Sequence, residues 1–81
     1  MGTVQSQDCV TIAREREEVM MVYLFKDRTL LKWFMAQPLD LLYPEHDDRL
    51  YQMYSDLRWE SRFVFTKCCR AVSSRLNLFT K

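Results

Sequence analysis

The chain has 81 residues, a formal net charge of +1, 48% hydrophobic residues, one Gly and two Pro. This hydrophobic content excludes simple disorder, and so few Gly and Pro residues argue against a many-stranded sheet, which needs turns. We therefore expect an all-α protein. A chain of this length forms one domain with a marginal core, so additional burial should come from a partner.

Charge is distributed unevenly along the chain. Residues 1–57 contain ten acidic and six basic side chains, whereas residues 58–81 contain one acidic side chain, Glu60, and six basic ones. Either the two parts neutralise each other, within one molecule or between two copies, or the basic C-terminal part meets an anionic partner.

The cysteine content bears on the compartment. Three Cys residues occur without a secretory signal segment, and an odd number of thiols favours a reducing environment. The longest apolar run, residues 19–25, is far shorter than the ~20 residues of a membrane span. We expect an intracellular protein that is not secreted and acts in the cytoplasm, in the nucleus or at a membrane surface.

The first eight residues lack periodicity and predict a flexible N-terminal arm, followed by a single helical domain over residues 9–81. The opening Met-Gly-Thr-Val-Gln-Ser fits the N-myristoylation pattern, which would place the acyl chain on Gly2, the one glycine of the chain. One myristoyl chain binds membranes weakly. A peripheral membrane adaptor would therefore need a second signal, either the basic tail or acylation of Cys68 or Cys69.

A first helix is predicted from about Thr11 to Gln37. Its expected core stripe follows the helical period. A break at Asp27, which could cap a second short helix, is one alternative, and a hairpin of strands 19–25 and 29–34 is another, disfavoured because its turn lacks Gly. The stripe consists of Ile12, Val19, Tyr23, Leu30 and Phe34.

Pro38 and Pro44 bracket a connector, since proline ends one helix and is tolerated at the start of the next. Three carboxylates follow Pro44, at Glu45, Asp47 and Asp48, and suit the positive end of a helix dipole. His46 lies among them, but the chain has no second His to complete a metal site. We expect neither a metal nor a cofactor.

A last long helix is predicted over residues 44–79, with one apolar side that is built for burial. The two to three helices would form a long helical hairpin, completed by a second copy as a homodimeric helical bundle. The apolar side consists of Leu50, Tyr54, Leu57, Val64, Phe65, Cys68, Val72 and Phe79.

The opposite side of this last helix combines basic and aromatic residues. Trp and Arg dominate interface energetics because each presents a large rigid area with a polar handle. The leading hypothesis is a small non-enzymatic interaction module, of the accessory or inhibitor kind, that binds a protein partner or a second copy of itself. The candidate partner-binding residues are Trp59, Arg62, Phe63, Thr66, Lys67 and Arg70.

Nucleic acid is the alternative partner. In a dimer, pairs of long helices can contact RNA phosphates through Arg, Ser and Thr, although Asp56 and Glu60 border the face concerned. No Gly-rich phosphate loop and no nucleophile paired with a base is recognisable, so we expect neither catalysis nor a small-molecule substrate. The row that would contact RNA consists of Arg62, Thr66, Arg70, Ser73 and Asn77.

Overall fold

The computed structural model describes the backbone of residues 4–80 and the side chains of residues 11–78. Within these bounds the chain is helical and contains no strand, which confirms the all-α class and shows that the strand-hairpin alternative was wrong. No helix in the described part is long and apolar enough to cross a membrane. The elements are α1 (Val4–Phe25), α2 (Arg28–Ala36), the 3-10 turn η1 (Leu39–Leu41), α3 (Asp48–Asp56) and α4 (Arg62–Thr80).

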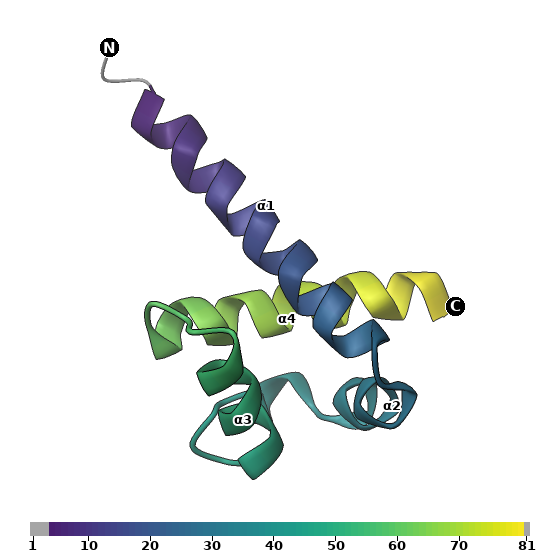
Figure 1. Ribbon diagram of the computed structural model, residues 1–81. Coiled ribbons are helices and arrows are strands. Elements are labelled where there is room, and N and C mark those ends of the chain that lie inside the picture. Colours follow the sequence, from purple (N-terminus) through teal and green to yellow (C-terminus); the bar gives the residue numbers. More distant parts are fainter. Residues whose placement is uncertain (1–3, 81) are drawn as a thin grey trace.

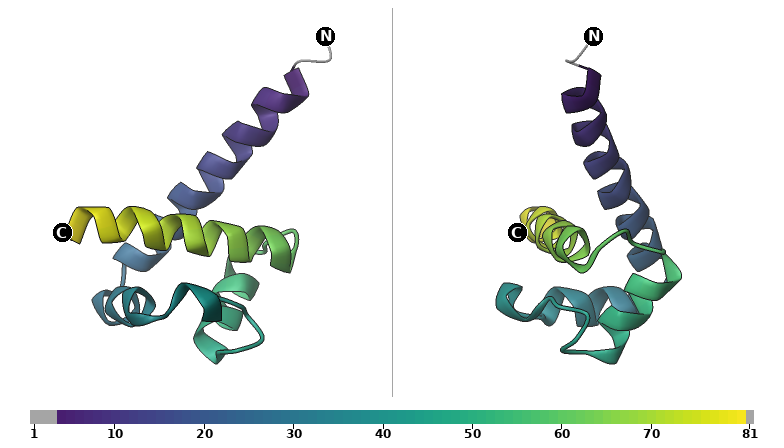
Figure 2. Two further views of the ribbon diagram at one scale, coloured as in Figure 1. Left: turned by 180° about the vertical axis from the view of Figure 1, so that it is seen from behind. Right: turned by 90° about the vertical axis from the view of Figure 1, so that its left-hand side faces the viewer.

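The two long helices, α1 and α4, cross each other, and α2 and α3 lie together on one side of α4 (Figure 1). The N-terminal half of α1 projects away on the other side, as both views in Figure 2 show. This projection gives the molecule its longest dimension of 45 Å. One flank of the projecting half therefore faces the N-terminal half of α4 across an open angle.

The core lies where α4 meets α1, α2 and α3. The face of α4 that carries Phe65, Cys69, Val72 and Leu76 is buried, because these residues recur at helical spacing on one side. The other helices contribute apolar side chains to the same cluster. They are Met20 and Leu24 from α1, Phe34 from α2, Leu42 from the connector, and Leu50 and Met53 from α3.

The break between α1 and α2 is at Asp27, as one sequence alternative predicted. The Asp27 carboxylate accepts hydrogen bonds from the backbone N–H groups of Thr29 (3.0 Å) and Leu30 (3.3 Å). This is an N-cap, in which a side chain satisfies donors that have no partner within the helix. The alternative of two helical pieces is confirmed.

The expected core stripe of the first helix is partly wrong. Phe34 is buried and Tyr23 and Leu30 are half-buried, but Ile12 is 50% and Val19 is 41% exposed. The helix break allows α1 to turn independently of α2. Its buried face is centred on Met20 and Leu24 instead, so one side of α1 keeps exposed apolar residues.

The predicted N-terminal arm overlaps α1, which begins at Val4, so residues 4–8 carry helical backbone. Residues 1–3, including Gly2, lie outside the described residues. Flexibility of the arm and myristoylation of Gly2 therefore stay predictions.

The predicted last helix from Pro44 is wrong in two places. Residues 44–46 form a turn and α3 begins at Asp48, where the Asp47 carboxylate caps the helix by accepting from the N–H of Arg49 (2.7 Å). The helix then ends at Asp56, and a separate helix, α4, begins at Arg62. The described chain is thus four α-helices rather than a hairpin of two long ones.

The end of α3 is a Schellman motif, the paired hydrogen-bond arrangement that closes many helices. Arg58 has φ 51°, the left-handed conformation that usually requires glycine. Its N–H bonds to the carbonyl of Ser55 (3.2 Å), and the N–H of Trp59 bonds to the carbonyl of Tyr54 (3.3 Å). The chain turns at this motif, and Trp59, the residue that follows Arg58, is buried.

The start of α4 is capped in turn. The Ser61 hydroxyl accepts a hydrogen bond from the N–H of Val64 (3.2 Å), which is the N-cap geometry. Trp59, between the two caps, is buried and packs edge-on against Phe65 with ring centres 5.5 Å apart. Burial of this large ring favours the corner over a continuous helix.

Candidate functional site

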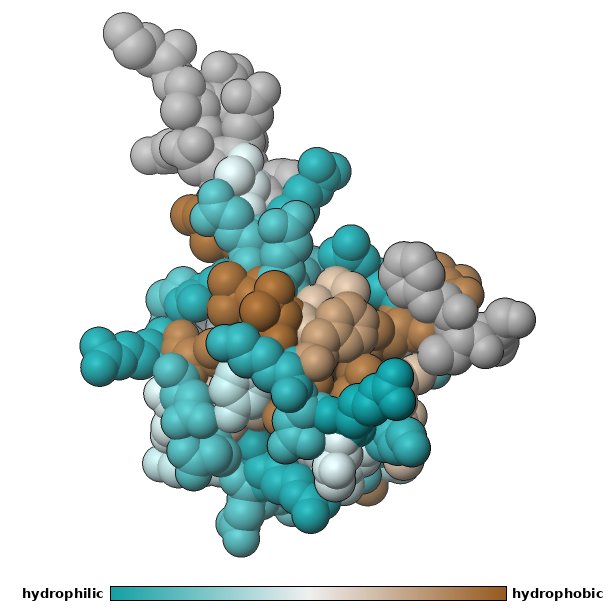
Figure 3. Space-filling view, turned by 45° about the vertical axis from the view of Figure 1, so that its right-hand side comes forward, coloured by the Kyte–Doolittle hydropathy of each residue, from teal (hydrophilic) through white to brown (hydrophobic). Residues whose placement is uncertain are grey.

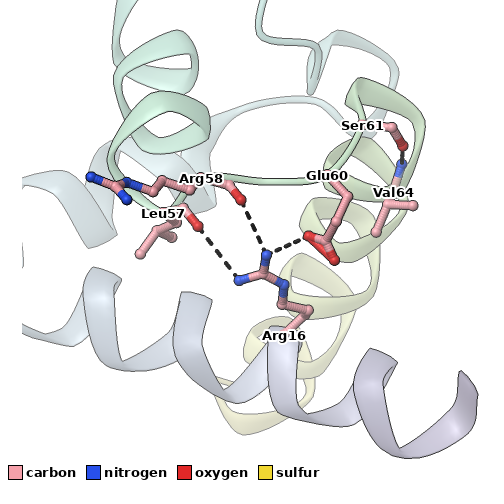
Figure 4. A network of polar contacts seen from close by, with 6 residues as sticks. All are labelled: Arg16, Leu57, Arg58, Glu60, Ser61 and Val64. Carbon is pink, nitrogen blue, oxygen red and sulfur yellow. Dashed lines mark hydrogen bonds and ion pairs between the residues drawn. The ribbon is translucent and has the colours of Figure 1, made fainter. Parts of the chain in front are cut away.

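Arg16 of α1 fixes the corner between α3 and α4 (Figure 4). Its guanidinium donates hydrogen bonds to the backbone carbonyls of Leu57 (3.5 Å) and Arg58 (3.2 Å), and to the carboxylate of Glu60. The same group lies 4.7 Å from the centre of the Trp59 ring, a cation–π distance. The hydrogen bond from Arg16 lowers the pKa of Glu60 below its usual range.

The six candidate partner-binding residues do not share one surface. Trp59 is 6% and Thr66 is 5% exposed, so both belong to the core, whereas Phe63 is 68% exposed. Arg62, Lys67 and Arg70 are exposed as well. The break at residues 57–61 separates Trp59 from the other five residues, which all lie in α4, and within α4 Thr66 is on the side that packs into the core.

Three of these residues come together on a groove between the N-terminal halves of α1 and α4. The groove is open to solvent and has a volume of about 950 Å³. Phe63, Lys67 and Arg70 line its α4 side, and the ammonium of Lys67 lies 4.8 Å from the centre of the Phe63 ring. The remaining lining residues are Ile12, Ala13, Arg16 and Glu17 of α1, Glu60 of the corner, and Val64, Cys68 and Ala71 of α4.

The floor and walls of this groove are apolar, and half of the Ile12 side chain and two-thirds of Phe63 stay in contact with solvent. Large exposed apolar residues side by side in a hollow are the usual mark of a docking site. The Cys68 thiol lies at the base, and burial raises its pKa, so it is held neutral at ordinary pH. The groove therefore offers contact area rather than a reactive group.

The rim of the groove carries a net positive charge. Both acidic groups of the lining are already paired, Glu60 with Arg16 and Glu17 with Arg75, the latter at 2.9 Å. Among the described side chains, no carboxylate lies within ion-pair distance of Lys67 or Arg70. Beyond them, Arg62 is 3.8 Å from Glu45 with both side chains largely exposed, a pairing that solvent weakens.

Arg70 also holds the connector against α4. It donates to the carbonyl of Leu39 (3.3 Å) and to the hydroxyl of Tyr43 (2.8 Å), and its guanidinium lies 5.3 Å from the centre of the Tyr43 ring. These partners are neutral, so the positive charge of Arg70 is not cancelled. Its position at the groove is fixed while its charge stays available.

The row expected to contact RNA is interrupted. Thr66 and Ser73 are 5% and 2% exposed and face the core, whereas Arg62 and Arg70 are exposed. The hydroxyl groups of this row are therefore not available to phosphates. Among the described residues, no three His, Cys, Asp or Glu side chains cluster as they would around a metal ion.

The sequence interpretation missed the α1 side of the groove. Ile12 and Arg16 are four residues apart, as are Ala13 and Glu17, so each pair lies on one helical face. Ile12 was assigned to the core because the predicted stripe ran unbroken through Asp27. The spacing of these pairs was visible in the sequence, but the crossing of α1 over α4 was not.

Comparison with family models, with curated proteins and with solved structures finds no match to this chain.

Proposed function

We propose that this protein is a non-enzymatic interaction module whose groove between α1 and α4 binds an acidic amphipathic segment of another protein. The observation that carries the proposal is the apolar hollow between Ile12 and Phe63, with the uncompensated cations Lys67 and Arg70 at its edge. Helix-in-groove recognition uses this combination, in which apolar residues of the ligand fill the hollow and charged ones meet the rim.

The expected ligand is a helix with bulky apolar residues at spacings of three and four and with Asp or Glu beside them. Apolar anchors would cover the exposed Phe63 ring and Ile12. The acids would face Lys67 and Arg70, which favours this ligand over a basic one and steers its approach. Two paired rim carboxylates, Glu17 and Glu60, disfavour a simple polyanion such as a nucleic acid.

Selection from a phage-displayed library of random peptides tests this proposal directly. The wild-type protein is expected to enrich peptides with apolar residues at helical spacing and a net negative charge. Phe63→Ala should abolish that enrichment because it removes the largest exposed wall of the groove.

Phe25→Ala is the matched control, since Phe25 is an exposed phenylalanine (56%) that does not line the groove. It should enrich the same peptides as the wild type. Failure to enrich any peptide, enrichment of basic peptides, or enrichment that Phe63→Ala leaves unchanged would each contradict the proposal.

A further inference from the structure

A second surface of α1, separate from the groove, keeps apolar side chains in solvent. Val19 is 41% and Val22 is 57% exposed. Together with Glu15 and Lys26 they follow the alternating spacing of three and four residues that places side chains along one seam of a helix. The N–H of Lys26 still bonds to the carbonyl of Val22 (3.2 Å), so the helical turn continues to the end of the seam.

This seam borders a shallow depression of about 500 Å³. Tyr23 and Leu57 form its wall, and the Tyr23 hydroxyl is held in place by a hydrogen bond to the carboxylate of Asp56 (2.7 Å). Figure 3 shows that, on the face drawn, apolar atoms are exposed among hydrophilic ones across the middle of the molecule. α1 is thus apolar on two sides, and a helix of that kind is usually covered on both.

The seam carries two opposite charges at equal distances from its centre. Glu15 lies four residues before Val19, and Lys26 lies four residues after Val22. Among the described side chains neither takes part in an ion pair. They cannot reach each other within one chain, because the 11 residue steps between their positions span about 16 Å of helix at 1.5 Å per residue.

We propose that a second copy of this chain covers the seam, with the two α1 helices antiparallel about a two-fold axis between Met20 and Met21. That arrangement places Val19 against the partner's Val22 and Glu15 against the partner's Lys26. Both contacts occur twice because the interface is symmetric. The acidic half of each seam then lies on the basic half of the other.

The charge pattern excludes the parallel alternative. Two parallel α1 helices would bring Glu15 against the partner's Glu15 and Lys26 against the partner's Lys26, and like charges at such positions repel. The antiparallel pair converts both contacts into attractions. Val19 and Val22 do not line the groove between α1 and α4, so this interface does not depend on the proposed peptide binding.

Charge reversal tests the pairing by sedimentation equilibrium. Glu15→Lys and Lys26→Glu, taken singly, should each weaken the dimer about tenfold, because each turns two symmetric attractions into repulsions. An equimolar mixture of the two variants should form a heterodimer about as tight as the wild-type homodimer, since a seam with two basic ends then meets a seam with two acidic ends. Far-ultraviolet circular dichroism checks that each variant is folded.

Lys32→Glu serves as the control, because Lys32 is exposed on α2 and lies outside the seam; it should leave the dimer unchanged. A wild-type protein that stays monomeric at all concentrations would overturn the proposal and indicate another occupant for the seam. So would a dimer that ignores both reversals, or a mixture no tighter than the single variants.

Discussion

The guanidinium of Arg16 lies 4.7 Å above the Trp59 ring while it donates to the carbonyls of Leu57 and Arg58. Through this one side chain, α1 holds the corner at which α3 ends and α4 begins. The corner also positions part of the groove lining, because it contains Glu60 and is followed closely by Phe63. Stability and the proposed binding site are therefore linked at Arg16.

Arg16→Ala should lower the free energy of unfolding by about 2 kcal/mol, since a cation–π contact and charged hydrogen bonds are lost together. Arg16→Lys should recover less than half, because an ammonium cannot fork between two carbonyls as a guanidinium does. Urea unfolding measures both. Arg14→Ala, at an exposed position on the same helix, should have almost no effect; an equal loss there would show that the network at Arg16 is not responsible.

The left-handed residue at the end of α3 predicts a stabilising substitution. Arg58→Gly should raise the free energy of unfolding by about 0.5–1 kcal/mol, because glycine adopts a positive φ without the steric penalty of a Cβ. Arg58→Ala keeps the Cβ and should leave stability nearly unchanged. If the two variants unfold at the same urea concentration, the Schellman geometry is not the cause.

Thr66 carries a buried hydroxyl with no hydrogen-bond partner among the described groups. Thr66→Val replaces it with a methyl group of similar size and should stabilise the fold by about 1 kcal/mol, because the desolvation penalty of an unpaired polar group is removed. Thermal unfolding measures the change. Thr29→Val makes the same substitution at an exposed site of α2 and is the control for Thr66→Val. Destabilisation by Thr66→Val would mean that the Thr66 hydroxyl is hydrogen-bonded.

Tyr23 predicts a pH effect at the alkaline end. Burial, together with the hydrogen bond to the Asp56 carboxylate, raises the pKa of Tyr23 from 10.0 to about 12. A raised pKa favours the neutral phenol in the folded state. Its contribution to stability is therefore complete below about pH 10 and is lost as the pH rises through about 12.

Ultraviolet titration of tyrosinate measures this. One of the four tyrosines should ionise late in the native protein, and the late step should vanish in Tyr23→Phe. The stability difference between wild type and this variant should shrink as the pH is raised from 10 to 12. A late step that persists in Tyr23→Phe would assign it to another tyrosine.

The sequence predicted the helical class and offered the Asp27 break as one alternative, because both rest on local signals, namely composition and a capping carboxylate. It did not predict the corner at residues 57–61. There the apolar helical period continues through Leu57 and Val64, and Arg58 stands where a helix end of this kind usually has glycine. The one local signal for a new helix is Ser61, which caps α4. Burial of Trp59 against Phe65 decides the corner, and that contact depends on the packing of α1 and α4.

The candidate site was predicted in part for the same reason. Phe63, Lys67 and Arg70 follow each other within α4, so their shared exposure is a property of one helix. Trp59 was placed beside them because the helix was assumed to be continuous. Thr66 lies within α4 itself, and its burial depends on how the other elements pack against that helix. The opposite wall, from Ile12 to Glu17, depends on where α1 crosses α4, which local periodicity does not encode.

The most direct measurement of groove binding is a ¹H–¹⁵N shift titration of the wild-type protein with an acidic amphipathic peptide from the selection. The amides of residues 12–17 and 60–71 should move together and saturate at one affinity, and Phe63→Ala should weaken that affinity at least tenfold, as for a central anchor. Shifts confined to residues 19–26, or to α2 and α3, would contradict the assignment of the groove as the binding site.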